Sequence, residues 1–333
     1  MINVTSCKVQ PIRLQDQIRL QFINACENMP RLPADPDDKT LVKAGMKMDW
    51  ILRKDPAIVK AMADLTSGSK DYVLFENMPV DTQLCPTPLD GYRPKDKLTW
   101  TSELTLISLL TLGKLHPFSY LEEKGKELIH QVAPVNSMVR TRSNAGRIPL
   151  DWHKDNSIID EEYRLDYLAL LALVNEANTT TSIASVSKAY KLLPEKYRVK
   201  LFDIEYRVKS PDSFDKAFAN KKIISEWKPL LNIDDEGRLV AAGNVYGVEC
   251  KTRSAKAALG ALGDALTAAA VDVVLRPGCL LIFNNNRVFH SRSEILGNRW
   301  LQRIFAKKDL DGIRTKALAG KHVHIFSARG LIL

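Results

Sequence analysis

The sequence predicts a mainly β fold, with a sandwich or jelly-roll core and flanking helices. Helical spacing of apolar residues dominates the first 70 positions, whereas short apolar runs separated by turn residues dominate from about position 131 onward. The glycine-rich phosphate loops of nucleotide-binding α/β folds, GxGxxG and GxxxxGK[ST], do not occur. Helices followed by many short strands are typical of a layered β core that helices cover.

We expect this core to belong to one domain that spans residues 1–333. Its expected parts are a helical N-terminal part over 1–70, a jelly-roll core with helical insertions over 71–306, and a C-terminal extension over 307–333. A chain of this length can bury a large core without disulfides or a structural metal. A metal site in it would therefore serve chemistry.

In the first half of the chain, helical periodicity gives way to a strand and a proline-rich loop. Prolines 86 and 88 each remove a backbone donor, which favours a loop over residues 85–91. Thr101 or Ser102 is the expected cap of the helix that follows this loop. The pattern predicts helices over 16–28, 41–52, 57–65 and 101–112, and a strand over 71–75.

In the second half, strands alternate with few helices. The near-continuous apolar run over 165–174 is expected of a buried strand, and Pro194 ends a helix predicted over 184–192. Arg276-Pro277-Gly278 is a turn signal between two short apolar runs. Further strands are predicted over 148–152, 271–275, 280–283 and 300–306.

Composition excludes several classes. The five cysteines are widely spaced and form no CxxC, which argues against disulfides and zinc-thiolate sites. No apolar stretch approaches the roughly 18 residues of a membrane span, and the N-terminus lacks a signal-peptide pattern. We expect a cytoplasmic protein without a membrane partner. The net charge of +9 is scattered, so a basic nucleic-acid-associated protein is an alternative but not the preferred interpretation.

A metal site is predicted from Asp151-Trp152-His153-Lys154-Asp155. On a strand, residues i and i+2 share a face, so His153 and Asp155 would project together, about 7 Å apart along the backbone. Among six histidines, His290 is the best third ligand because it closely follows a predicted strand. Two histidines and one carboxylate leave open positions on iron, where a bidentate 2-oxo acid and O₂ can bind.

Two arginines near His290 predict a carboxylate clamp. Arg299 and Arg303 lie four residues apart, so both would face the same side of an extended strand. Arginine forms bidentate pairs with carboxylates, as a dicarboxylate co-substrate requires at its far end. The apolar neighbours Trp300, Leu301 and Ile304 argue against two solvated surface arginines.

With these features the sequence resembles the clavaminate synthase-like (TauD-related) Fe(II)/2-oxoglutarate dioxygenases, and most of all their free amino acid hydroxylases. The resemblance covers roughly residues 70 to 306. It is carried by Pro86-Thr87-Pro88, Gly125-Lys126-Glu127-Leu128-Ile129, Ala133-Pro134, His153-Lys154-Asp155, Asn178-Thr179-Thr180-Thr181, Arg276-Pro277-Gly278, Asn286-Arg287-Val288, His290-Ser291-Arg292-Ser293 and Arg299-Trp300-Leu301-Gln302-Arg303.

The resemblance implies a distorted double-stranded β-helix and a set of roles. His153, Asp155 and His290 would bind Fe(II), and Arg299 would pair with the distal carboxylate of 2-oxoglutarate. A threonine would assist Arg299, with Thr181 preferred and Thr180 the alternative because three consecutive threonines blur the register.

On the substrate side, Arg303 would hold a carboxylate, and His130 and Gln131 would line the pocket. The implied reaction splits 2-oxoglutarate to succinate and CO₂ and hydroxylates an unactivated C–H bond, although desaturation is also open. The expected substrate is a free L-amino acid, with lysine the first guess and asparagine or another polar amino acid the second.

Some features depart from the family or leave alternatives. The carboxylate ligand is Asp155, where many of these hydroxylases have Glu, and residues 239–245 contain no acid, which disfavours a guanidinium substrate. A peptide- or carrier-bound substrate and a catalytically silent binding protein are the rival interpretations. His322 and His324 are expected to lie on a polar strand face, and the oligomeric state is not predicted.

Overall fold

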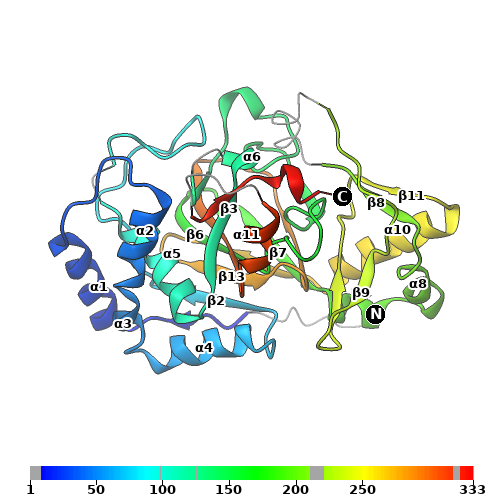
Figure 1. The fold of residues 1–333 in the computed structure, drawn as a ribbon, viewed down its shortest axis with the longest axis horizontal. Helices are drawn as coiled ribbons and strands as arrows, with labels where there is room; N and C mark the ends of the chain where they lie inside the picture. The colour runs from blue at the N-terminus through cyan, green and yellow to red at the C-terminus, as the bar shows by residue number, and fades with distance from the viewer. Residues whose placement is uncertain (1–8, 98, 125–126, 211–220, 318–322, 333) are drawn as a thin grey trace.

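The computed structural model describes residues 9–97, 99–124, 127–210, 221–317 and 323–332. Helices gather in two groups: α1 to α4 lie at one end of the molecule, and α8 and α10 at the other (Figure 1). The helices are α1 Asp16–Asn28, α2 Asp38–Met46, α3 Asp49–Leu52, α4 Pro56–Thr66, α5 Thr101–Leu112, α6 Leu121–Lys124, α7 Val186–Leu192, α8 Glu195–Lys200, α10 Arg253–Ala268 and α11 Asp311–Lys316.

Two sheets form the centre of the described structure. The larger has eight strands in the order β1-β2-β13-β6-β15-β3-β16, with β4 also paired to β15, and the smaller has the order β12-β7-β14-β5. Two further pairs are β10 with β9 and β11 with β8. The strands are β1 Ile12–Arg13, β2 Tyr72–Glu76, β3 His116–Tyr120, β4 His130–Val132, β5 Leu150–His153, β6 Tyr167–Asn175, β7 Thr180–Ser185, β8 Tyr206–Val208, β9 Leu231–Ile233, β10 Leu239–Ala241, β11 Val248–Cys250, β12 Val271–Val274, β13 Leu280–Asn284, β14 Val288–Arg292, β15 Arg299–Lys307 and β16 Ile325–Phe326.

The apolar run of β6 is explained by burial on both of its faces. Its alternate residues Leu168 and Leu170 join a buried cluster with Ile183 of β7 and Val288 of β14, which fills the space between the two sheets. The intervening residues, such as Leu171, join a second cluster with helices α1 to α5. A third cluster packs α7, α8 and α10 against the outer face of the smaller sheet. The two sheets are thus enclosed by helices on both sides.

The predicted helices and strands largely agree with the structure. The helix over 16–28 and the strand within 165–174 are confirmed, whereas 41–52 forms two short helices, α2 and α3. The expected cap of α5 is wrong: Trp100 occupies the N-cap position and no side chain caps the helix. Ser102, one of the two expected caps, instead donates from its hydroxyl to the buried Asp81.

The turn Arg276-Pro277-Gly278 connects the two sheets, since it leads from β12 to β13. Gly278 has φ +80°, and an added Cβ would lie 3.2 Å from the Met78 carbonyl oxygen, so glycine is required at this crossing. Helix α10 and strands β7 and β14 are the main elements that the sequence did not predict. The distorted double-stranded β-helix stays a prediction, because the pairing shows a two-sheet β core without establishing that topology.

Candidate functional site

Strands β5 and β14 bring the three predicted metal ligands together. His153 and His290 are direct partners in the antiparallel pair, and Asp155 follows two residues beyond His153. The Asp155 Oδ1 atom lies 3.6 Å from His153 Nε2 and 3.5 Å from His290 Nε2. One ligand atom from each residue lies within 4.8 Å of the other two, so a single ion can bind all three.

A hydrogen bond leaves the Nε2 atom of His153 free for a metal. His153 Nδ1 lies 2.8 Å from the Asp151 carbonyl oxygen. This contact fits the tautomer in which Nδ1 carries the proton and donates it, so that Nε2 keeps a lone pair for a metal. Burial lowers the pKa of His153 to about 3, and the neighbouring His290 adds to the effect. His290 Nδ1 is buried and has no hydrogen-bond partner in the described structure. Neutral imidazoles are the form that binds metal ions.

Arg303 keeps Asp155 ionised. Burial alone would raise the pKa of Asp155, but the charge of Arg303 and the contacts with His290 and His153 hold that pKa well below its usual range. Arg303 Nη1 donates to Asp155 Oδ2 at 2.5 Å, which leaves Oδ1 facing the two histidines. This arrangement fits a carboxylate that binds a metal through one oxygen.

A buried arginine lies behind the triad. Arg299 Nη2 donates to Thr181 Oγ1 at 3.2 Å, and Arg299 Nε has no partner among the described residues. Burial and the neighbouring Arg292 lower the pKa of Arg299 to about 9, so its charge lacks compensation. A small cavity of about 30 Å³ joins Arg299, Thr181 and Arg292 to the three predicted metal ligands.

The β7 register separates the two threonine candidates. Strand residues alternate faces, and Thr181 lies on the same face of β7 as Ile183, which packs between the two sheets. Thr180 lies on the other face, and its backbone N–H donates to Ser293 Oγ. Thr181 is therefore the residue that contacts Arg299.

Arg303 has more partners than the sequence suggested. Besides Asp155, its Nη2 donates to Glu123 Oε2 at 2.6 Å and lies 2.8 Å from His130 Nδ1. Only Nε is buried without a hydrogen bond in the described structure. Burial raises the pKa of Glu123, an effect that Arg303 opposes. Arg303 and Glu123 together place opposite charges beside the predicted metal site.

A larger cavity of about 410 Å³ opens next to the triad. His130 and Gln131 both line it, but each has fixed contacts: His130 holds Arg303, and Gln131 Oε1 accepts from Trp300 Nε1 at 2.9 Å. Both residues therefore line the cavity with side chains whose hydrogen bonds to Arg303 and Trp300 hold them in place. The polar side chains that also line the cavity are Asp90, Tyr92, Glu123, Ser137, Arg142, Ser143, Asn144, Asn156, Ser157, Lys209 and Asn244.

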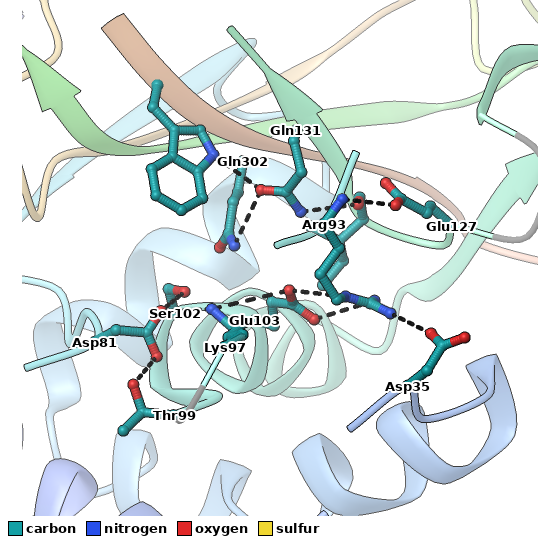
Figure 2. Close-up of polar contacts among 12 residues, drawn as sticks. Asp35, Asp81, Arg93, Lys97, Thr99, Ser102, Glu103, Glu127, Gln131 and Gln302 are labelled. Atoms are coloured by element: carbon teal, nitrogen blue, oxygen red, sulfur yellow. Dashed lines mark hydrogen bonds and ion pairs between the residues drawn. The ribbon is translucent and has the colours of Figure 1, made fainter. Parts of the chain in front are cut away.

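Buried ion pairs hold one wall of this cavity in place. Figure 2 shows Arg93 between Glu103 of α5 and Asp35, while the backbone N–H of Arg93 donates to Glu127 at 2.7 Å. Lys97 binds Asp81 at 2.8 Å in the same network. The loop that carries Asp90 and Tyr92 is thereby fastened to α5 and to the segment before β4.

Several residues of the site were not found from the sequence. Glu123 precedes β4 in a helix of ordinary composition, and only the pairing of His130 with Arg303 on β4 and β15 brings it to the triad. Asn144 lines both cavities and comes from an irregular loop. The predicted place of His324 on a strand face is wrong, because His324 lies in a bend just before the short strand β16, while His322 lies outside the described residues.

A two-histidine, one-carboxylate triad between two β-sheets, with a buried arginine behind it, defines the class of non-haem iron oxygenases that use a 2-oxo acid. The family model "Taurine catabolism dioxygenase TauD, TfdA family" matches residues 106–305, which is more than half of the chain. This protein belongs to that family.

Similar proteins specify the class further. The chain is 28% identical to the L-asparagine oxygenase of Streptomyces coelicolor over 305 residues, 86% of each chain, and 28% identical to clavaminate synthase 2 of Streptomyces clavuligerus over 268 residues, 74% of this chain and 77% of the other. A crystal structure of asparagine oxygenase with Fe(II), 2S,3S-3-hydroxyasparagine and succinate superposes with a TM-score of 0.81 and 25% identity, covering 95% and 99% of the two chains. The protein is an Fe(II)/2-oxoglutarate-dependent dioxygenase of the amino acid hydroxylase type.

Across the described ranges, no helix is long and apolar enough to cross a membrane.

Proposed function

We propose that His153, Asp155 and His290 bind Fe(II), and that the enzyme hydroxylates a free L-amino acid with a polar, uncharged side chain, asparagine being the first to test. The convergence of three ligand atoms within 4.8 Å carries this proposal. The overall reaction consumes the amino acid, 2-oxoglutarate and O₂ and yields the hydroxylated amino acid, succinate and CO₂. Bound iron supplies the oxygen activation, while the protein supplies positions and a dry pocket.

Arg299 and Thr181 are proposed to bind the distal carboxylate of 2-oxoglutarate. The guanidinium is buried, lacks any carboxylate partner within the described structure, and has an unbonded Nε. A buried charge without a counter-charge is unfavourable, so a bound carboxylate would supply the missing partner. The cavity that joins Arg299 to the triad supports the same molecule reaching the metal through its other end.

Arg303 and Glu123 are proposed to recognise the zwitterionic end of the amino acid. Arg303 Nε is the donor left for the substrate's carboxylate, and Glu123 offers the opposite charge for the ammonium group. Both line the larger cavity together with the predicted metal ligands His153 and Asp155. Charge-assisted hydrogen bonds of this kind are the strong ones and fix orientation.

The remaining lining favours a neutral polar side chain over lysine. Arg142 pairs with Asp151, and Lys209 pairs with Glu249, so these charges are already compensated. Asn144 lines both cavities, and no hydrogen bond of its side-chain amide is found within the described residues. A free amide is suited to a substrate amide. The similarity to an asparagine oxygenase supports this choice, whereas the comparisons give lysine, the first guess, no support.

The test measures succinate formation from 2-oxoglutarate with anaerobically loaded Fe(II), across the free L-amino acids including asparagine and lysine. We expect one polar amino acid to stimulate turnover, and mass spectrometry to find one added oxygen in the product. His153→Ala should abolish turnover, whereas His116→Ala, which changes an exposed histidine of β3, should not.

Other outcomes would redirect the proposal. Stimulation by lysine instead of a neutral amino acid would refute the choice of side chain. Slow 2-oxoglutarate consumption without stimulation by any free amino acid would refute the free substrate and favour a peptide- or carrier-bound residue. Wild-type turnover by His153→Ala would refute the iron site.

A further inference from the structure

The position of Asp155 is not determined by the sheet. Strand β5 ends at His153, so Asp155 lies beyond the last backbone pair between β5 and β14. Asn156, the next residue, has φ +56°, a left-handed conformation that turns the chain away from the strand. A metal ligand in such a turn needs other contacts to keep its carboxylate in place.

Asn285 provides such contacts to the backbone of Asp155. Its side-chain Oδ1 accepts from the Asp155 N–H at 3.2 Å, and its Nδ2 donates to the Asp155 carbonyl oxygen at 3.1 Å. The side chain is 0% exposed. The amide thus replaces the two backbone hydrogen bonds that a neighbouring strand residue would have made. Asn285 lies only five positions before His290, so it connects two of the three ligands.

Lys154 makes a second connection between the same two segments. Its ammonium group donates to the Asn286 carbonyl oxygen at 2.6 Å and to the Ala241 carbonyl oxygen, and it lies 5.4 Å from the ring centre of Phe289, the neighbour of His290. Lys154 is 1% exposed. Its backbone N–H also donates to Asn244 Oδ1 at 2.9 Å.

A lysine buried to this extent is unfavourable for folding alone. Moving an ammonium group out of water is strongly disfavoured unless hydrogen bonds compensate, and an apolar side chain of similar length would fill the space without that penalty. Two contacts of Lys154, with the Asn286 carbonyl oxygen and the Phe289 ring, join the residue between two predicted metal ligands to the segment that carries the third. Their location therefore indicates a role in the metal site.

We propose that Asn285 and Lys154 are positioning residues that hold Asp155 in register with His153 and His290, so that the site is formed before the metal binds. This inference rests on the proposed iron site. It adds the prediction that metal affinity depends on two residues that do not touch the metal. Preformed ligands bind more tightly because less ordering accompanies binding.

The experiment measures Mn(II) affinity by calorimetry on the full chain, because Mn(II) occupies the same type of site without turnover. The variants are Asn285→Ala and Lys154→Met, with His153→Ala as the ligand control. Asn28→Ala and Lys60→Met are matched controls, since they change an exposed asparagine and an exposed lysine away from the site. Thermal unfolding of each metal-free variant is recorded in parallel.

We expect Asn285→Ala and Lys154→Met each to weaken Mn(II) binding about 10–100-fold, as is usual for residues that orient metal ligands. Matched controls should bind like the wild type. A merely structural role would lower the unfolding temperature without changing the dissociation constant. Wild-type affinity in both site variants would therefore overturn the inference.

Two further results are decisive. Should Asn285→Ala fail to fold, Asn285→Asp replaces it, because it keeps the side-chain shape but loses the donor to the Asp155 carbonyl; weakened binding supports the inference and unchanged binding overturns it. If the wild type binds Mn(II) no better than His153→Ala, the proposed iron site itself fails and the inference falls with it.

Discussion

At the scale of single residues, the site is organised by buried charged side chains. Arg303 is shared between Asp155 and Glu123, whereas Arg299 has a hydroxyl partner but no carboxylate partner among the residues that the structure describes. The first arginine is compensated before any ligand binds, and the second is not. This difference fits the proposal that a carboxylate of 2-oxoglutarate supplies the negative charge that Arg299 lacks. The ammonium group of the proposed amino acid would compete with Arg303 for Glu123.

The two neighbouring threonines provide a matched test of the 2-oxoglutarate position. Thr181→Val removes the hydroxyl that contacts Arg299, and loss of one hydrogen bond of about 1 kcal/mol should raise the KM for 2-oxoglutarate about fivefold. Thr180→Val changes the opposite face of β7 and should leave this KM within about twofold. Steady-state kinetics at saturating amino acid measures both values. Equal effects would contradict the assignment.

Lys228 gives the protein a pH-dependent stability that does not involve the triad. Its ammonium group donates to the Ser157 carbonyl oxygen, and burial, helped by Arg164, lowers its pKa from 10.5 to about 8. Between pH 8 and about 10.5 the unfolded chain binds more protons at this residue than the folded chain, so its contribution to the free energy of unfolding rises with pH.

Relative to Lys228→Met, the wild type should therefore gain stability as pH increases from 8 to 10, by at most about 1.4 kcal/mol per pH unit. Urea unfolding at several pH values measures the difference, and Lys60→Met, at an exposed lysine, serves as the control. A difference between wild type and Lys228→Met that does not change with pH would show that the pKa of Lys228 is unshifted.

At the scale of elements, ion pairs and hydrogen bonds fasten the loop between β2 and α5 to the buried helix α5 (Figure 2). Glu103 is 0% exposed and accepts from Arg93 Nε and Nη2 at 3.2 Å each, with Lys97 at 4.0 Å. Arg93 lies within three residues of Asp90 and Tyr92, both of which line the cavity. A helix that is buried all round therefore anchors a loop beside the large cavity.

Removing the charge of Glu103 should disturb both stability and substrate binding. Glu103→Gln leaves Arg93 buried without a full partner, which should lower the free energy of unfolding by about 3–5 kcal/mol. The exposed pair of Asp311 and Arg314 is the control, and Asp311→Asn should cost under about 1 kcal/mol. Urea unfolding measures both. The KM for the amino acid should rise in Glu103→Gln, while an unchanged KM would mean that this wall does not contact the substrate.

At the scale of the whole molecule, the ligands and the fold stabilise each other. The site joins strands of both sheets, since Arg299 and Arg303 come from the larger sheet and His153, His290 and Thr181 from the smaller. A ligand that contacts both sheets binds the folded state alone. Its binding free energy therefore adds to the stability of the entire two-sheet core.

We expect 2-oxoglutarate at 100 times its dissociation constant to stabilise the Mn(II)-loaded protein by about 2.7 kcal/mol. Arg299→Met should abolish the increase in the free energy of unfolding that 2-oxoglutarate causes, and should keep the increase that Mn(II) causes. The same variant should raise the stability of the ligand-free protein, because it removes a buried and uncompensated cation. Thermal unfolding with and without each ligand tests these signs. An intact 2-oxoglutarate increment in Arg299→Met would contradict the clamp.

Local patterns were sufficient for much of the fold. Helix α1 was predicted from the helical spacing of its apolar residues, because it is buried on one face only. Strand β6 was predicted from a continuous apolar run, because it is buried on both faces. His153 and Asp155 do lie close together, but the predicted reason, alternation along one strand, is wrong because β5 ends at His153 and Asp155 lies in the turn that follows. The family's motifs supplied His290 as the third ligand, and β14 delivers it beside His153.

The sequence by itself predicted the three residues that meet at the site, the arginine pair and the strand-rich core. Only the tertiary structure decided that Thr181 and not Thr180 contacts Arg299, that Arg303 is shared with Glu123, and that Asn285 holds the backbone of Asp155. The physical reason is that the features predicted from the sequence depend on residue spacing along one segment or on the motifs of the family. The features decided by the tertiary structure depend on register and packing between segments far apart in the chain, for which local periodicity carries no signal.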